Sequence, residues 1–249
     1  MNSDLTQNLM PTIGLIVPPA SGEVPHDAAL LYGHRIRFIA RGLGIGSISP
    51  AGFEPVMRSI IDKAKELRDQ GVKGISLMGT SLSFHRGVVF AEALRLEMEA
   101  ATGLPCTTMS HAVTSALNEL RVRRVAVATA YTDELNARLR EFLTQSGFEV
   151  AAIEGMAISG VKEVAAVSSA QLFELAKNVY AASANAEGIL ISCGGLLTLD
   201  VIRPLEQELG VPVVASSPSG FWDVVRMLGV NPASPGYGRL FEIQKRHTA

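Results

Sequence analysis

The fold is decided by a stretch that occurs twice, first as Gly74-Ile75-Ser76-Leu77-Met78-Gly79-Thr80-Ser81-Leu82 and again as Gly188-Ile189-Leu190-Ile191-Ser192-Cys193-Gly194-Gly195-Leu196. The offset between the two copies is 188 − 74 = 114 residues. Two further matches keep the same order. Ile13 to Pro19 resembles Val125 to Tyr131 at an offset of 112, and Gly103-Leu104-Pro105 resembles Gly210-Val211-Pro212 at 107. Three matches at nearly one spacing predict two related halves.

Short β-branched runs alternate with amphipathic helical patterns around these repeats. Most of the runs are apolar throughout, which is typical of strands covered on both faces. We expect strands over Thr12–Val17, Gly74–Met78, Pro105–Thr108, Arg124–Ala128, Glu149–Ile153, Gly188–Ser192 and Pro212–Ala215, and helices over Phe53–Gln70, Val88–Ala101, Asp133–Ser146 and Ala170–Ala182. This alternation favours an α/β fold with parallel sheets.

We therefore predict two pseudo-symmetric Rossmann-like halves, each with a parallel sheet flanked by helices. We assign residues 1–120 and 218–249 to the first half and residues 121–217 to the second. Ligands of open α/β sheets bind beyond the carboxyl ends of the strands, so the active site is expected in the cleft between the halves.

Composition limits the partners that this chain can have. The 249 residues carry a net charge of −2 and include no block of Lys or Arg, so we expect neither nucleic acid nor a membrane surface as a partner. The longest uncharged apolar stretch, Gly188–Leu199, is too short to span a bilayer. Met1–Met10 does not read as a signal peptide, and two cysteines suit a reducing compartment, so the expected location is the cytoplasm. Nothing in the sequence requires a dimer, and we expect a monomer or a weak oligomer.

The residues that follow the predicted strands carry the candidate chemistry. Thr80 and Ser81 place two adjacent hydroxyls at the start of a helical pattern, which suits either an anion cradle or a simple helix cap. Cys193 places an ionisable thiol at the equivalent point of the other half, beside a glycine pair that lets backbone approach a ligand. If the halves face each other, a bound carboxylate would have the thiol beside its α-carbon, which is a geometry for proton transfer.

Other conspicuous residues are assigned to structure. Cys106 lies inside a predicted strand and is expected in the core, as is Trp222. Ser110 and Ser217 are interpreted as helix caps. The glycine-rich Gly42–Gly46 follows no clear strand and is not taken as a dinucleotide loop. The histidines have no partner at metal-ligand spacing, so no metal site is expected.

Six segments carry a resemblance to a known family that runs over nearly the whole chain. They are Thr12 to Pro19, Ser76 to Phe84, Gly103 to Ser110, Ala128 to Tyr131, Ser192 to Asp200 and Pro235 to Phe241. Through these segments the chain resembles the aspartate/glutamate/hydantoin racemase superfamily and, within it, the arylmalonate decarboxylases.

The resemblance implies a one-sided reaction. Racemases of this superfamily carry one cysteine in each half, and the two positions correspond here to Gly79 and Cys193. A single acid can still protonate one face of a carbanion that loss of CO₂ has generated. The implied activity is the cofactor-independent, enantioselective decarboxylation of α-aryl or α-alkenyl malonates to chiral monocarboxylic acids through an enediolate, with Cys193 as proton donor. We find no motif for pyridoxal phosphate, thiamine or a metal, and expect the second carboxylate of the substrate to receive the electron pair.

The resemblance also assigns binding residues. A dioxyanion hole is expected from Thr80, Ser81, Tyr131 and Gly194, with the backbone N–H groups of Ser81 and Gly194. The expected pocket residues are Pro18, Gly79, Ile45, Ile48, Phe53, Val161 and Val164. Phe53 stands where the family pattern has tyrosine, which affects substrate preference rather than reaction type.

Two alternative functions remain compatible with the sequence. One is a racemase or isomerase of the same superfamily that acts on a small carboxylic acid with one thiol. The other is a non-catalytic, two-lobed protein that binds carboxylates and does not need Cys193.

Overall fold

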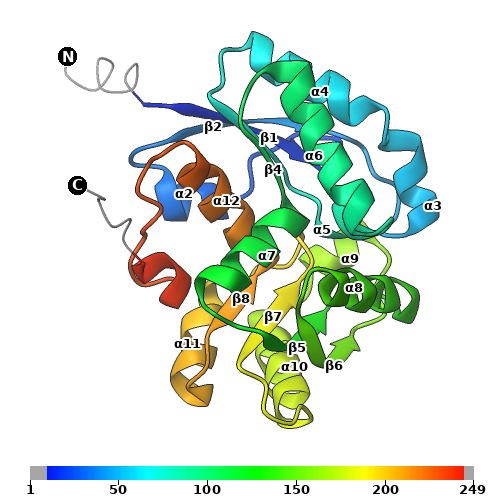
Figure 1. The fold of residues 1–249 in the computed structure, drawn as a ribbon, viewed down its shortest axis with the longest axis vertical. Helices are drawn as coiled ribbons and strands as arrows, with labels where there is room; N and C mark the ends of the chain where they lie inside the picture. Colours follow the sequence, from blue (N-terminus) through cyan, green and yellow to red (C-terminus); the bar gives the residue numbers. More distant parts are fainter. Residues whose placement is uncertain (1–9, 244–249) are drawn as a thin grey trace.

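The computed structural model describes residues 10–243, which form two four-stranded parallel sheets (Figure 1). Their strand orders are β2-β1-β3-β4 and β6-β5-β7-β8, so the second sheet repeats the first with every strand displaced by four. The strands are β1 (Thr12–Val17), β2 (Arg37–Gly42), β3 (Gly74–Leu77), β4 (Cys106–Thr108), β5 (Arg124–Thr129), β6 (Glu149–Gly155), β7 (Gly188–Ser192) and β8 (Val213–Ala215). This confirms the predicted α/β architecture with two related halves.

Helices cover both sheets and fill the space between them (Figure 1). They are α2 (Asp27–Tyr32), α3 (Pro50–Phe53), α4 (Ser59–Asp69), α5 (Thr80–Phe84), α6 (Val88–Thr102), α7 (Met109–Glu119), α8 (Asp133–Gln145), α9 (Val161–Ala165), α10 (Ser169–Ala181), α11 (Leu199–Leu209) and α12 (Ser216–Met227), with 3-10 turns η1 (Glu54–Val56) and η2 (Arg239–Glu242). Helices α4 and α6 pack on the first sheet and α8, α10 and α11 on the second. Helices α7 and α12 pack against each other and touch strands of both sheets.

All seven predicted strands are present, with ends within two residues of those expected. The prediction missed β2, Arg37–Gly42, which is an edge strand that pairs with β1 alone. Its apolar run is interrupted by Arg37 and Arg41, because an edge strand is only partly covered. The statement that Gly42–Gly46 follows no strand is therefore wrong, since β2 ends at Gly42.

One predicted helix is also wrong in extent. The pattern over Phe53–Gln70 predicts one helix, whereas the chain forms α3, the 3-10 turn η1 and then α4. Pro55 has no backbone N–H to continue α3, so the helix stops and restarts at Ser59.

The chain returns to the first half after β8. Helix α12 packs on α7, β3 and β4, and the segment after it is tied to α2 by two hydrogen bonds. The Tyr32 hydroxyl donates to the Pro232 carbonyl at 2.7 Å, and the Ser234 hydroxyl donates to the Leu31 carbonyl at 2.9 Å. These contacts agree with the return of the chain after residue 217, while the exact boundaries stay a prediction. Residues 1–9 and 244–249 of the assigned first half lie outside the described residues.

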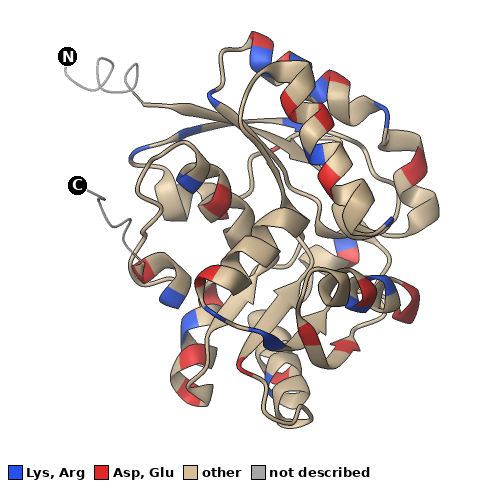
Figure 2. Ribbon diagram, in the orientation of Figure 1, with Lys and Arg blue, Asp and Glu red and all other residues tan. Residues whose placement is uncertain are grey.

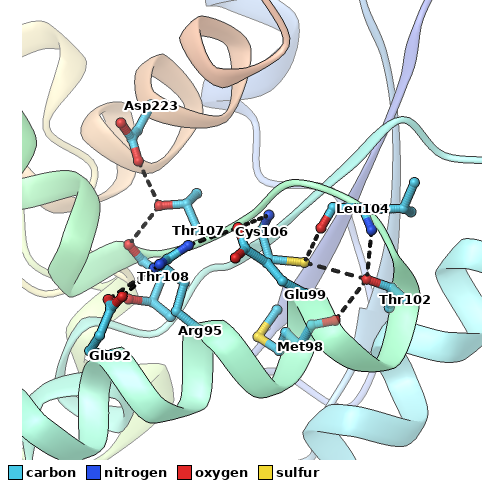
Figure 3. A network of polar contacts seen from close by, with 10 residues as sticks. All are labelled: Glu92, Arg95, Met98, Glu99, Thr102, Leu104, Cys106, Thr107, Thr108 and Asp223. Atoms are coloured by element: carbon cyan, nitrogen blue, oxygen red, sulfur yellow. Dashed lines mark hydrogen bonds and ion pairs between the residues drawn. The ribbon is translucent and has the colours of Figure 1, made fainter.

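Cys106 is a core residue, as predicted (Figure 3). It is fully buried in β4, and its thiol contacts the Leu104 carbonyl at 3.4 Å and the Thr102 hydroxyl at 3.7 Å. The neighbouring Thr107 donates to the buried carboxylate of Asp223 on α12 at 2.6 Å. These polar contacts connect β4 to α6 and α12 away from the cavity described below. Trp222 is also buried, as expected.

Charged residues lie mainly on the outward helices α4, α6, α8, α10 and α11, with both signs interspersed (Figure 2). Among residues 10–243, no helix is both long and apolar enough to cross a bilayer.

Candidate active site

A cavity of about 540 Å³ opens where the strand ends of the two halves meet. The predicted proton donor, Cys193, lines this cavity. All seven predicted pocket residues line it too: Pro18, Ile45, Ile48, Phe53, Gly79, Val161 and Val164. Of the four residues predicted for the dioxyanion hole, three are lining residues, namely Thr80, Ser81 and Gly194. The fourth, Tyr131, is not a lining residue and is fully buried, but its hydroxyl contacts Thr80, Ser81 and Cys193, which do line the cavity. A cavity is therefore present where the cleft was expected, and the roles of the residues around it stay a prediction.

The first half contributes the turn at Gly79, where β3 passes into α5. Gly79 is the extended residue before the helix, and α5 has no side-chain cap, so the cap interpretation of Thr80 and Ser81 is wrong. Instead, the Ser83 hydroxyl holds the turn by bonding to the Gly79 and Thr80 carbonyls, both at 2.9 Å. The Thr80 hydroxyl points to the sulfur of Met109 at 2.8 Å. Because a thioether is a weak acceptor, this hydroxyl can be redirected to a ligand at small cost.

Tyr131 is positioned by the end of β5. The Thr129 hydroxyl donates to Asn136 at 2.7 Å and accepts from the Tyr131 backbone N–H at 3.0 Å. The Tyr131 hydroxyl accepts from Ser192 at 3.4 Å. Burial raises the pKa of Tyr131 above its ordinary value, and contacts with Ser192, Thr80 and Ser81 oppose that rise only in part. Tyr131 is therefore a neutral donor whose hydroxyl lies among the hydroxyls of both halves.

Cys193 lies in the turn after β7 and is 5% exposed. Helix α11 begins only at Leu199, so the expected helix start beside the thiol is absent. Burial raises the pKa of Cys193 to about 11, and hydrogen bonds from the Gly195 backbone and the Tyr131 hydroxyl offset part of this effect. The thiol is thus protonated at neutral pH before any substrate binds.

Gly194 packs closely against Met109 and Met78. A Cβ atom at this position would lie 2.9 Å from the Met109 sulfur and 3.3 Å from the Met78 carbonyl. Met109 therefore supports both Thr80 and Gly194, one from each half. Met109 could not be recognised from the sequence, because an apolar residue at the start of a helix looks like ordinary core.

One end of the cavity is apolar and joins the two halves. Ile45 and Ile48 follow β2, Val161 and Val164 follow β6, and Phe53 lies on α3. The Ile48 backbone N–H donates to the Ser159 carbonyl at 2.8 Å, which links the two loops directly. The Pro18 carbonyl accepts from the Gly44 and Ile45 N–H groups, both at 3.0 Å, and so fixes the loop after β2.

The remaining part of the wall mixes apolar residues such as Val24 and Leu197 with polar and acidic ones. Glu23, His26 and Asp27 line it, and none of the described lining residues is Lys or Arg. Ser217 is not a helix cap, as was predicted, but donates to the Asp27 carboxylate at 2.8 Å. The cap prediction for Ser110 is also wrong, since Thr108 caps α7.

Within residues 10–243, no three His, Cys, Asp or Glu side chains are grouped so as to hold a metal ion.

The fold and the cavity define a class: an α/β protein of two parallel four-stranded sheets with one thiol in the cavity between its halves. The chain belongs to the arylmalonate decarboxylase family, whose model matches residues 13–241.

Two groups of relatives fit this assignment. The chain is 52% identical over 239 residues to an arylmalonate decarboxylase of Bordetella bronchiseptica, covering 96% of this chain and 99% of the relative. It is 25% identical over 250 residues to a maleate isomerase of Nocardia farcinica, covering 95% and 98%.

Solved structures give the same two groups. One is a liganded arylmalonate decarboxylase with a glycine-to-cysteine and a cysteine-to-serine substitution. It is 52% identical, has a TM-score of 0.92 and covers 94% of this chain and 99% of its own. The Nocardia farcinica maleate cis-trans isomerase bound to Tris has a TM-score of 0.86 at 20% identity, over 93% and 98% of the two chains, which shows a shared fold.

Proposed function

We propose that this protein decarboxylates α-aryl or α-alkenyl malonates without a cofactor and gives a chiral monocarboxylic acid. The observation that carries the proposal is a buried, protonated thiol, Cys193, in a cavity wall whose neighbours are neutral hydrogen-bond donors from both halves. Membership of the arylmalonate decarboxylase family supports the reaction type.

The first step, loss of CO₂, requires a group that accepts the electron pair of the broken bond. When the bond between the α-carbon and one carboxylate breaks, CO₂ leaves as a neutral molecule and its bonding pair stays on the α-carbon. The remaining carboxylate takes up that pair as an enediolate. We assign its two oxygens to the Thr80, Ser81 and Tyr131 hydroxyls and to the backbone N–H groups of Ser81 and Gly194. Each well-placed donor contributes about 2.7–4 kcal/mol of transition-state stabilisation, so several together can take the place of a cofactor.

The departing carboxylate is assigned to the apolar end of the cavity. Ile48, Phe53 and Val164 are each 9% exposed or less and offer no hydrogen bond from their side chains. A carboxylate against them is poorly solvated, and its conversion to CO₂ removes the charge that this environment disfavours. The same argument places the enediolate oxygens at the opposite, donor-rich side.

The second step is a proton transfer from one side. The S–H bond of Cys193 breaks, its proton forms the new C–H bond at the α-carbon, and a thiolate remains until water returns a proton. One proton is consumed per turnover. Because Gly79 occupies the matching position of the first half, no thiol acts from the other face, and one enantiomer forms in excess.

The proposal is tested with phenylmalonate and methylphenylmalonate, supplied without metal or cofactor. We expect CO₂ release from both and an optically active product from the methyl derivative. Cys193→Ala should abolish turnover while circular dichroism shows an intact fold. Full turnover by this variant, or no CO₂ from any malonate, would overturn the proposal. Racemisation or rapid deuterium exchange of an enantiopure arylpropionate by the unaltered protein would favour an isomerase instead.

We also propose a cytoplasmic location, a monomer or weak oligomer, and the two-part division at residues 120 and 217. The free thiols of Cys106 and Cys193 support a reducing compartment. We expect neither nucleic acid nor a membrane among the partners. Sedimentation velocity measures the oligomeric state directly.

A further inference from the structure

We propose that the end of the cavity formed by Asp27 and Ser217 selects malonates whose aryl group carries a hydrogen-bond donor or a positive charge. The inference rests on the proposed function and concerns which aryl groups the same cavity prefers.

The strand order places this polar pair opposite the apolar end. Ile48 and Val161 follow β2 and β6, which are the corresponding edge strands of the two sheets. Ser217 follows β8, the other edge strand of the second sheet, and Asp27 reaches it from α2, which contacts α12 (Figure 1). Cys193 follows β7, between these edges. The reacting carbon at Cys193 therefore has an apolar end on one side and the acidic pair on the other.

Asp27 offers one acceptor atom to a ligand. The residue is 6% exposed and lines the cavity. The Ser217 hydroxyl donates to its Oδ2 at 2.8 Å, whereas Oδ1 has no hydrogen-bond partner among the described residues. Because Asp27 lines the cavity, this free oxygen can accept a hydrogen bond from a donor on a bound ligand.

Charge fixes which part of the substrate reaches Asp27. A malonate carboxylate beside Asp27 would meet a like charge, and no Lys or Arg among the described lining residues would compensate it. The two carboxylates are already assigned to the donors around Cys193 and to the apolar end. The aryl group is the part that remains, and Val24 and Leu197, apolar lining residues that are 37% and 57% exposed, offer it apolar contact.

A donor on the far side of the ring then bonds to Oδ1 of Asp27. A positively charged donor makes a charge-assisted hydrogen bond, which we expect to raise kcat/KM about tenfold over a neutral group of the same shape. An anionic substituent at the same place is expected to lower it.

The test compares 4-(aminomethyl)phenylmalonate with 4-ethylphenylmalonate, which has nearly the same shape but no charge. In competition at pH 7, the wild-type protein should prefer the amine about tenfold. Asp27→Asn should bring the ratio of the two kcat/KM values to about one. Glu23→Gln is the matched control, because it removes the same charge from an exposed position at the mouth, and its ratio should stay within about twofold of wild type.

A wild-type ratio near one, or an unchanged ratio in Asp27→Asn, would overturn the inference about Asp27. The proposed function is tested separately by turnover of phenylmalonate, and it would stand if phenylmalonate is decarboxylated. Calorimetric affinities for the two matching arylacetates give the same ratio without turnover. The inference is therefore tested even if no malonate is decarboxylated. If Asp27→Asn does not fold, Asp27→Ser, which keeps a hydroxyl partner for Ser217, takes its place.

Discussion

The thiol of Cys193 should be alkylated with an unusual dependence on pH. Its pKa of about 11 lies two units above the ordinary thiol value of 9.0, because the side chain is buried. At pH 7 the thiolate fraction is about 10⁻⁴, against about 10⁻² for an ordinary cysteine, so iodoacetamide should react about 100-fold more slowly with Cys193.

The sign of the effect gives a sharper test than the rate itself. A raised pKa means that the reactive thiolate keeps increasing beyond pH 9, where the rate of an ordinary thiol levels off. The logarithm of the alkylation rate, followed by mass spectrometry of the Cys193 peptide, should rise by about one per pH unit from pH 7 to pH 10. Slow entry into the cavity would lower the rate at every pH without changing this slope.

Two controls for the alkylation rate of Cys193 come from the same chain. The same peptide in denaturant gives the ordinary thiol. Tyr131→Phe removes a hydrogen bond that lowers the pKa of Cys193, and the rate at a fixed pH should fall further. A plateau at or below pH 8 in the native protein would refute the reasoning, because a thiol ionised near neutrality could not be the proton donor.

Three other substitutions test separate parts of the structure. Gly194→Ala places a methyl group 2.9 Å from the Met109 sulfur, and we expect kcat/KM for phenylmalonate to fall at least about tenfold for a stability loss of about 1–3 kcal/mol. Gly79→Cys adds a second thiol opposite Cys193, and the α-hydrogen of 2-phenylpropionate should exchange with D₂O, as followed by NMR. Asp223→Ala removes the buried carboxylate that accepts from Thr107 and Arg226, and should cost about 3 kcal/mol in denaturant unfolding with the cavity left unchanged.

Each of these has an outcome that contradicts it. Normal turnover in Gly194→Ala would mean that Met109 moves aside without disturbing Thr80. Absence of exchange in Gly79→Cys would contradict the two-sided geometry, provided that the variant still releases CO₂ through Cys193. Asp223→Asn keeps the shape of the side chain and is the control for Asp223→Ala. An equal loss of stability in both would point to charge rather than hydrogen bonding.

Much of the fold follows from local pattern. Strands buried on both faces are continuous apolar runs, and such runs found β1, β3 and β7 with little error. The same logic misses β2, because an edge strand carries Arg37 and Arg41 and has no clear pattern. The pattern also predicts one helix where Pro55 separates two. The hydrophobic period continues across the turn, and the break comes from the missing backbone N–H of proline.

Site residues that directly follow a strand could be predicted from the sequence. Contacts between residues that lie far apart in the sequence could not. Thr80 and Cys193 could be identified as strand-end residues with useful chemistry. The apolar residues such as Ile48 came only from the family resemblance, since any apolar residue has core as its default interpretation. The pair of Asp27 and Ser217 lies 190 residues apart, and no local signal connects the two.

The absence of Lys and Arg from the described cavity wall has a consequence for how substrate arrives. No positive charge on the wall attracts a doubly charged malonate, so the substrate enters the cavity by ordinary diffusion. Association and affinity should therefore change little between dilute buffer and concentrated salt, in contrast to enzymes that capture anions with arginine. The selectivity of this cavity is set by shape and by short-range donors, which counterions in solution do not screen.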